Sequence, residues 1–332
     1  MESMEPETRA TRPQRGPRRG LWGLLSAAAA LVGIASLAGL FDSHGFVLAF
    51  TVHFRAQYAV CLGAACLLFA WGRRWKALLI YAPVLVLNLV AVLPAFLPGP
   101  ALRNEGPVLR ALVANVFTKN EDPAALLGLI RKENPDLIVL LEVNQRWWSA
   151  LTPLFPSYPH RLEDLREDNF GIAVLSKFPL NDSGVVHFGR GQPPTIITRL
   201  ATEAGKLYVV ATHPASPRDE ARLRKNTEQL EAIAEHIRGV EGEVLVLGDL
   251  NTTPWASSFR SLLETAELRD SRRGFGNQAT WPVGLTGLKL PLDHALVSAG
   301  IDVVERRLGP EIGSDHLPLL VSFGLAGELA PH

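Results

Sequence analysis

The stretch from Val244 to Asn251 reads VLVLGDLN, an apolar run that ends in two polar side chains. Such a run beside a glycine is typical of a buried strand, in which residues two apart point to the same side. Asp249 and Asn251 should therefore project together. A carboxylate beside a carboxamide suits phosphate-ester chemistry, because one orients water or a metal ion while the other hydrogen-bonds developing charge. The same residue types also favour turns and helix N-caps, so the pair alone is not decisive.

Further strands and helices are predicted on both sides of this stretch. The strand candidates are residues 108–114, 137–141, 170–175, 195–200, 206–211, 292–297, 303–308 and 317–323. Helices are predicted after Asp122-Pro123 and over residues 218–238 and 254–263. Many strands with interspersed helices, several of them joined by hairpins, indicate a mixed or antiparallel α/β arrangement.

Polar residues recur where these apolar strands end. They are Asn115, Glu142, His213, Asp249, Asn251, Asp293, Asp315 and His316. Taken singly, each has a structural explanation, such as the start of a loop, a cap or a partner for an arginine. Taken together, they predict a cluster of carboxylates, amides and imidazoles, provided that the strand ends converge.

The ordered set of motifs resembles the endonuclease/exonuclease/phosphatase superfamily, and specifically its membrane-anchored bacterial branch. The motifs span residues 108–324 and comprise Asn115, LLEV with Glu142, THP with His213, GDLN with Asp249, TWP from Thr280, LDH with Asp293 and SDH with His316. The resemblance implies a four-layer α/β sandwich of two packed mixed or antiparallel sheets flanked by helices. It also implies a site at one end of that sandwich.

The resemblance implies a role for each of these residues in a metal-dependent phosphoesterase. Glu142 is the expected principal ligand of Mg²⁺ or Mn²⁺, supported by Asn115 and Asp315 directly or through water; oxygen donors suit such hard cations. His316, held by Asp293, is expected to act as the general base or as a charged partner of the phosphate. Asp249 orients the attacking water, and Asn251 and His213 donate to the phosphate oxygens.

Two positions have a structural interpretation of their own. Leu141 stands where many relatives have glutamine before the metal-binding glutamate, so one supporting hydrogen bond is expected to be missing. His294 follows Asp293 and is interpreted as a structural residue on the other face of its strand, because neighbouring residues of a strand point to opposite sides.

The first hundred residues have a different composition. Residues 1–20 are polar, proline-rich and basic, which predicts a disordered tail. Apolar segments follow at residues 21–40, at 57–71, which is extendable back to residue 46, and at 77–97. A span needs about 20 apolar residues, and the h-region of a signal peptide is shorter. Residues 21–98 are therefore predicted to be a membrane anchor of about three transmembrane helices.

The distribution of basic residues predicts the orientation. The tail and the link Arg73–Lys76 are basic and are expected on the cytoplasmic side. Three spans then place the predicted phosphoesterase domain, residues 103–325, outside the cytoplasm, followed by a short tail at 326–332. The predicted location is the cell (inner) membrane, multi-pass. No facing charges mark a transport path, so we interpret the spans as an anchor.

Charge bears on the substrate. The net charge of zero combines nine Lys and Arg against four Asp and Glu before Arg103 with 24 against 29 in the remainder. A mildly acidic C-terminal part lacks the charge pattern of a strong nucleic-acid binder. Tethering near headgroups favours a lipid phosphodiester, and nucleic acid is the alternative substrate. The other class of function is a non-catalytic, membrane-anchored domain that binds a lipid or a partner; no obligate protein partner is evident.

Overall fold

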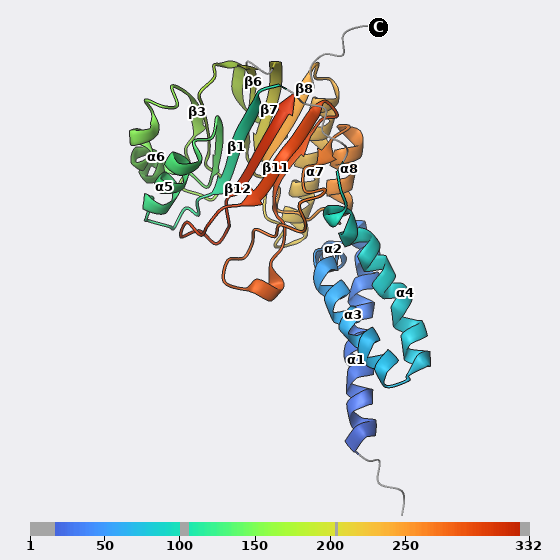
Figure 1. Cartoon of the computed structure of the whole chain (residues 1–332). Coiled ribbons are helices and arrows are strands. Elements are labelled where there is room, and N and C mark those ends of the chain that lie inside the picture. Colours follow the sequence, from blue (N-terminus) through green and yellow to red (C-terminus); the bar gives the residue numbers. More distant parts are fainter. Residues whose placement is uncertain (1–16, 100–105, 203–204, 326–332) are drawn as a thin grey trace, which may run out of the picture.

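The computed structural model describes residues 17–99, 106–202 and 205–325. Figure 1 shows an α/β sandwich and a bundle of helices that extends from one side of it. The tails predicted at 1–20 and 326–332 lie outside the described residues, except that residues 17–20 belong to the first helix.

The first sheet has six strands in the order β11-β12-β1-β2-β4-β3. They are β1 (Val108–Asn115), β2 (Leu137–Leu141), β3 (His160–Asp164), β4 (Ile172–Ser176), β11 (Ile301–Leu308) and β12 (Leu319–Leu325). β1 and β2 are parallel, and the other neighbours are antiparallel. The parallel pair places the ends of β1 and β2 at the same edge of the sheet.

The second sheet has six strands in the order β5-β6-β7-β8-β10-β9. They are β5 (Leu180–His187), β6 (Pro194–Thr202), β7 (Gly205–Thr212), β8 (Glu243–Asp249), β9 (Arg269–Asp270) and β10 (Asp293–Val297). β7 and β8 are parallel, and the other neighbours are antiparallel. The stretch that begins at Val244 thus forms β8, inside this sheet.

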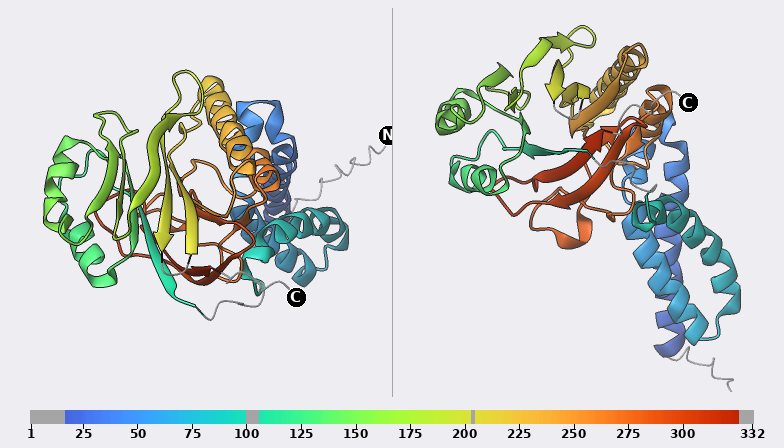
Figure 2. Two further views of the ribbon diagram at one scale, coloured as in Figure 1. Left: turned by 90° about the horizontal axis from the view of Figure 1, so that it is seen from above. Right: turned by 45° about the horizontal axis from the view of Figure 1, so that its top comes forward.

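The two sheets pack face to face through aliphatic side chains such as Val139, Val209 and Leu247. α5 (Ala124–Glu133) and α6 (Gln145–Ala150) cover the outer face of the first sheet. α7 (Glu220–Arg238) and α8 (Ser257–Thr265) cover the outer face of the second, and Figure 2 shows these helices outside the sheets. The predicted four-layer α/β sandwich is confirmed. Short 3₁₀ helices include η2 (Leu93–Phe96), which follows the last helix of the bundle, and η3 (Thr152–Leu154) and η4 (Thr286–Leu288) in the sandwich.

The bundle contains α1 (Pro17–Ala38), η1 (Gly39–His44), α2 (Phe46–Val52), α3 (Arg55–Trp71) and α4 (Trp75–Val92). Two helices, Gly20–His44 and Trp75–Phe96, are long and apolar enough to cross a membrane. α2 and α3 pass that test only as a pair, and they are bent by 64° at the break between them. The second predicted segment is therefore not one straight helix through residues 46–71.

A buried polar cluster joins the helices of the bundle. Arg55 at the start of α3 donates from Nη1 to the Ser36 carbonyl oxygen at 2.9 Å, and the Asn88 amide donates to Ser36 Oγ at 2.8 Å. Arg55 is buried by these contacts. The charge of Arg55 packs between helices, because their polar groups satisfy it.

The bundle and the sandwich are joined by reciprocal helix capping. The backbone N–H of Phe46 at the start of α2 donates to Glu220 Oε2 at 2.7 Å. The backbone N–H of Ser257 at the start of α8 donates to Asp42 Oδ2 at 2.6 Å. The N-cap residues of these two helices are glycine and alanine, which have no side-chain acceptor. Val52 of α2 is also buried in the core beneath α7 and α8.

Candidate active site

Polar side chains from both sheets meet at one edge of the sandwich. Asp249 ends β8 and lies directly opposite Asp293, the first residue of β10. Side chains of directly opposed residues point to the same face of a sheet. From the other sheet, Asn115 at the end of β1 donates through Nδ2 to Glu142 Oε1 at 3.1 Å and to Asp249 Oδ2 at 3.4 Å. The predicted convergence of these strand ends is therefore present.

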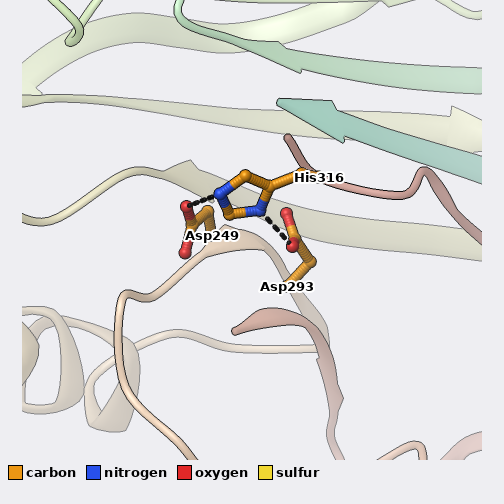
Figure 3. A group of neighbouring side chains, drawn as sticks. All are labelled: Asp249, Asp293 and His316. Carbon is orange, nitrogen blue, oxygen red and sulfur yellow. Dashed lines mark hydrogen bonds and ion pairs between the residues drawn. The ribbon is translucent and has the colours of Figure 1, made fainter. Parts of the chain in front are cut away.

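The imidazole of His316 lies between two carboxylates, as Figure 3 shows. His316 Nδ1 donates to Asp293 Oδ2 at 2.8 Å, and His316 Nε2 lies 3.6 Å from Asp249 Oδ2. All three side chains are buried. The Ser314 hydroxyl accepts from the His316 backbone N–H at 3.1 Å and donates to the Asn115 carbonyl oxygen at 2.7 Å. Ser314 thereby attaches the loop that bears His316 to the end of β1.

Burial and charge set the protonation of this group. Burial opposes a charge on His316, but Asp293 and Asp249 outweigh it and raise the pKa of the ring to about 10. Burial raises the pKa of Asp249 to about 7, although His316 counteracts it. Burial also acts to raise the pKa of Asp293, but the charge of His316 and its hydrogen bond override it and lower that pKa. His316 is thus a buried cation at neutral pH.

Glu142 follows β2 and is held from two directions. The Thr118 backbone N–H donates to Glu142 Oε2 at 3.1 Å, and Asn115 donates to Oε1. Burial nevertheless raises the pKa of Glu142. Glu142 has a φ of 63°, in the left-handed region that a residue with this side chain rarely occupies. Such backbone strain is common where a side chain must be aimed into a site.

The amide of Asn115 bridges carboxylates in this structure. Its nitrogen donates to Glu142 and Asp249, while its oxygen accepts from the Phe117 backbone N–H at 3.0 Å. The assignment of amide oxygen and nitrogen follows from these partners.

Asn251 and His213 flank Asp249. The Asn251 backbone N–H donates to Asp249 Oδ1 at 2.8 Å, and its side-chain nitrogen donates to the Pro214 carbonyl oxygen at 3.0 Å. His213 Nε2 lies 3.5 Å from Asp249 Oδ2, whereas His213 Nδ1 is buried without a hydrogen-bond partner among the described residues. Burial, with a smaller effect from the charge of His316, lowers the pKa of His213 to about 4. Its ring is therefore neutral.

Asp315 is half-buried at the rim of the cluster. Trp281 Nε1 donates to Asp315 Oδ2 at 3.1 Å, and the Trp281 ring lies 6.4 Å from that of His316. His294 faces the other side of its strand, where its Nε2 bonds the Thr252 carbonyl oxygen at 2.9 Å. That placement matches the structural role interpreted from its position next to Asp293.

Close backbone contacts require glycine at two positions of the site. Gly248 precedes Asp249, and a Cβ there would lie 1.8 Å from the Thr212 carbonyl oxygen of β7. A Cβ at Gly171 would likewise lie 1.8 Å from the Val143 carbonyl oxygen. These glycines let the strand ends approach closely enough for their side chains to meet.

The cluster opens into a cavity of about 630 Å³. Glu142, Asp249 and His316 line its inner end, and Arg218 and Arg222 line it from the start of α7. A larger cavity of about 980 Å³ lies elsewhere, between residues such as Pro94 and Arg272, and holds none of the cluster. Sequence reasoning missed Thr118, whose hydroxyl and backbone N–H contacts with Glu142 carry no sequence motif, and it assigned no role to Ser314 of the SDH motif.

The fold and the cluster define a class: a two-sheet α/β sandwich with carboxylates and histidines gathered where its strands end. Residues 112–316, more than half of the chain, match the Endonuclease/Exonuclease/phosphatase family, and the chain belongs to that family. The resemblance of the sequence motifs to this superfamily is thereby confirmed, whereas its membrane-anchored branch stays a prediction. No curated protein sequence matches the chain.

Solved structures share this fold at low sequence identity. An endonuclease/exonuclease/phosphatase from Beutenbergia cavernae DSM 12333 is 20% identical, with a TM-score of 0.55 over 68% of this chain and 74% of that chain. The 3'-5' exonuclease NExo from Neisseria meningitidis is 21% identical, with a TM-score of 0.55 over 65% and 100%. D. rerio TDP2, complexed with a single-strand DNA product, is 17% identical, with a TM-score of 0.57 over 66% and 100%.

Proposed function

We propose that the chain is a membrane-tethered, divalent-metal-dependent hydrolase of phosphate esters. The observation that carries this proposal is the buried unit of His316, Asp293 and Asp249, next to Glu142. Burying so many charged groups is costly, and a structural role alone would be served better by apolar residues. Membership of the Endonuclease/Exonuclease/phosphatase family supports the same chemistry.

The proposed reaction is in-line attack of water on phosphorus. Asp249, with its pKa near 7, orients the water and accepts a proton from it. His316, kept charged and oriented by Asp293, donates to a phosphoryl oxygen as negative charge develops there. General-base action by His316, the other role that the resemblance implies, requires its pKa to fall toward neutrality, as happens when a second positive charge lies nearby.

The carboxylates fit a hard divalent cation. Glu142 and Asp249 are buried with raised pKa values, so a nearby positive charge would relieve their mutual repulsion. We propose Glu142 as the principal ligand of Mg²⁺ or Mn²⁺, with Asp315 and Asn115 in support. Asn115 would need to turn its amide oxygen inward to ligate directly. A bound divalent cation neutralises charge on the phosphate oxygens and the leaving group.

A metal ion bound by Asp249, Asp293 and His316 would be less consistent with the hydrogen bonds of the cluster. Atoms of Asp249, Asp293 and His316 lie within 4.8 Å of one another and have the right chemistry for ligands. However, His316 Nδ1 and Asp293 Oδ2 already share a hydrogen bond of 2.8 Å. A metal bound there would have to break the strongest contact of the cluster, so we place the metal beside Glu142.

Neutral donors and cations complete the proposed phosphate site. Asn251 and His213 flank Asp249 and are proposed to donate to the phosphate oxygens. Arg218 and Arg222 line the same cavity and add positive charge. The substrate we propose is a phosphodiester, from a lipid headgroup or from nucleic acid; the structural similarity to TDP2 with its DNA product supports the second source.

We further propose that residues 21–98 anchor residues 103–325 to the cell (inner) membrane as a multi-pass segment, with the enzyme outside the cytoplasm. The helices Gly20–His44 and Trp75–Phe96 support this by length and composition, and the basic link Arg73–Lys76 supports the orientation. Protease added to intact spheroplasts should cleave loops of the sandwich while leaving a cytoplasmic marker protein intact. Cleavage that requires permeabilised cells would contradict the orientation.

The proposed activity is tested on the full chain in detergent micelles with bis(4-nitrophenyl) phosphate. Hydrolysis should require Mg²⁺ or Mn²⁺, disappear in EDTA and return when the metal is restored. His316→Ala should abolish it, whereas His160→Ala, a matched change on edge strand β3, should not. Hydrolysis that persists in EDTA would refute the metal requirement. A folded protein that hydrolyses neither this ester nor other phosphate esters would favour the non-catalytic binding domain.

A further inference from the structure

The cavity of the candidate site is built partly by the N-terminal bundle. Phe46, Ala49, Phe50 and His53 line it together with the cluster that contains His316. These four residues follow the i, i+3, i+4, i+7 spacing of one helix face, so α2 presents a continuous side to the cavity. The bundle is therefore a wall of the site and not merely a tether beside it.

α2 is held in this position by several contacts. Glu220 accepts from its first backbone N–H, and Val52 at its end is buried in the sandwich core. His53 Nδ1 and Thr253 Oγ1 share a hydrogen bond of 2.9 Å. Because Thr253 lies two residues after Asn251, this bond ties α2 directly to the loop that follows β8.

A row of aromatic rings leads from the cavity along the bundle. Phe46 and Phe50 have ring centroids 6.4 Å apart, Phe50 and Phe54 are 5.3 Å apart, and Phe54 and Tyr58 are 6.3 Å apart. The first two rings line the cavity, and the last belongs to α3. The row thus connects the phosphate site with the apolar helices, and Phe50 is 55% exposed along it.

The loop between β9 and β10 adds a second apolar element. Leu285 and Leu288, in and beside η4, are 55% and 53% exposed, and Leu290 lines the cavity. Gln57 of α3 donates from Nε2 to the Lys289 carbonyl oxygen at 3.0 Å, which ties this loop to the bundle. Figure 1 shows the orange loop on the same side of the sandwich as the bundle.

We infer that the substrate is a membrane lipid whose headgroup is joined through a phosphate ester, and that α2 and the η4 loop bind its apolar tail. The inference rests on the proposed function. The cavity is lined by the charged cluster and by aromatic side chains of α2, which matches an amphiphile with a phosphate at one end. Water adds to phosphorus, the ester P–O bond breaks, and the leaving group departs with the bonding electron pair and is protonated by the solvent where its basicity requires.

Single-stranded nucleic acid is the competing occupant, because bases also stack on aromatic rings. The observations favour the lipid, since the aromatic row continues into helices apolar enough to cross a membrane rather than along a basic groove. The exposed leucines beside the cavity likewise present aliphatic surface, which suits an acyl chain better than a sugar-phosphate backbone.

The test compares two synthetic diesters with the same leaving group, hexadecyl 4-nitrophenyl phosphate and methyl 4-nitrophenyl phosphate. The full chain is assayed in mixed micelles with Mg²⁺. The wild type should prefer the hexadecyl ester in kcat/KM. The double change Phe46→Ser with Phe50→Ser should reduce that preference by about tenfold or more, which corresponds to ~1.4 kcal/mol. Val47→Ser, on the same helix and 74% exposed outside the cavity, is the matched control and should leave the preference intact.

The outcomes separate the inference from the proposed function. Hydrolysis of both esters with no preference, or a preference unchanged by the double variant, would overturn the lipid assignment and leave the phosphoesterase standing. If the protein hydrolyses neither ester, both the lipid assignment and the proposed phosphoesterase activity are refuted. Inhibition of methyl-ester hydrolysis by a single-stranded oligonucleotide, stronger than that by phosphatidylglycerol in the same micelles, would identify nucleic acid as the occupant instead. A second variant, Leu285→Ser with Leu288→Ser, should reduce the preference in the same direction if the loop binds the tail.

Discussion

Replacing Asp293 with asparagine tests whether His316 is held as a buried cation. Burial opposes protonation of the ring, yet Asp293 and Asp249 raise its pKa from 6.5 to about 10. A rise of that size corresponds to a net stabilisation of the charged ring of ~5 kcal/mol, after the opposing effect of burial, with Asp293 and Asp249 as the main favourable partners. Asp293 is the closer partner, at 2.8 Å against 3.6 Å. We assign about 3 kcal/mol to it, which is within the range for breaking a buried ion pair.

The pH dependence has a defined sign. Because the pKa of His316 is higher in the folded state, the stabilisation is fully present below pH 6.5 and is lost as the pH rises through about 10. The pKa of Asp293 is lowered from 3.8, so its contribution is present above pH 3.8 and is lost as the pH falls through the folded value. The effect of Asp293→Asn should therefore be largest between these limits and small near pH 10.

Thermal unfolding of the full chain in detergent and EDTA measures this effect, with tryptophan fluorescence as the signal. A loss of about 3 kcal/mol lowers Tm by roughly 6–12 °C for a fold of this size. We expect that decrease near pH 6 and little difference near pH 10. Asp270→Asn is the matched control, because Asp270 lies 2.8 Å from Arg272, whose charge persists across this range. A decrease for Asp293→Asn that is equal at both pH values would refute the buried cation.

Three further changes, the last with a matched control, have defined outcomes. His316→Ala should lower kcat/KM for a phosphodiester by about 10²–10⁴-fold with near-UV circular dichroism unchanged; normal activity would exclude a role in the reaction. Glu142→Gln should raise the Mg²⁺ concentration for half-maximal activity by about tenfold or more, equivalent to ~1.4 kcal/mol, and an unchanged metal titration would place the metal elsewhere. Gly248→Ala should destabilise the fold by about 3 kcal/mol or more in thermal unfolding, because its Cβ would meet the Thr212 carbonyl oxygen. Gly128→Ala, in helix α5 with open space around it, should instead stabilise by about 0.5–1 kcal/mol.

Strands with buried faces and the residues that end them were predictable from the sequence. β2 coincides with the predicted residues 137–141, and β8 ends at Asp249 as its apolar run indicates. A run of aliphatic residues marks a strand between two packed layers, and the first polar residue marks its end. The cluster of polar residues was also predictable, provided that the strand ends converge. β3 and β5 gave no such signal, because they are edge strands with half-buried or exposed residues and no apolar alternation.

Contacts between residues far apart in the chain were not predictable. Ser314 supports Asn115 from 199 residues away, and its hydroxyl has no local pattern that indicates the partner. The bend after α2 was also missed, because residues 46–71 are apolar apart from a few polar side chains such as His53 and Arg55, and hydropathy alone is consistent with one continuous helix. The residues at this bend are held by distant partners, since His53 Nδ1 and Thr253 Oγ1, 200 residues apart in the sequence, share a hydrogen bond, and the start of α2 is capped by Glu220, which lies 174 residues from Phe46. Hydropathy reports which residues avoid water, but it does not report which partner accepts the first N–H of a helix.

The exchange of helix caps makes the bundle and the sandwich depend on each other. α2 has seven residues, and a helix of that length is not stable in water by itself. It is helical because Glu220 caps it and because Val52 packs under α7 and α8. In return, Asp42 caps α8, whose own N-cap is an alanine. Without the bundle, α8 would lose its cap, the core beneath α7 would lose Val52, and the site cavity would lose one wall. The residues that line the site cavity therefore include part of the segment that hydropathy alone identifies only as an anchor.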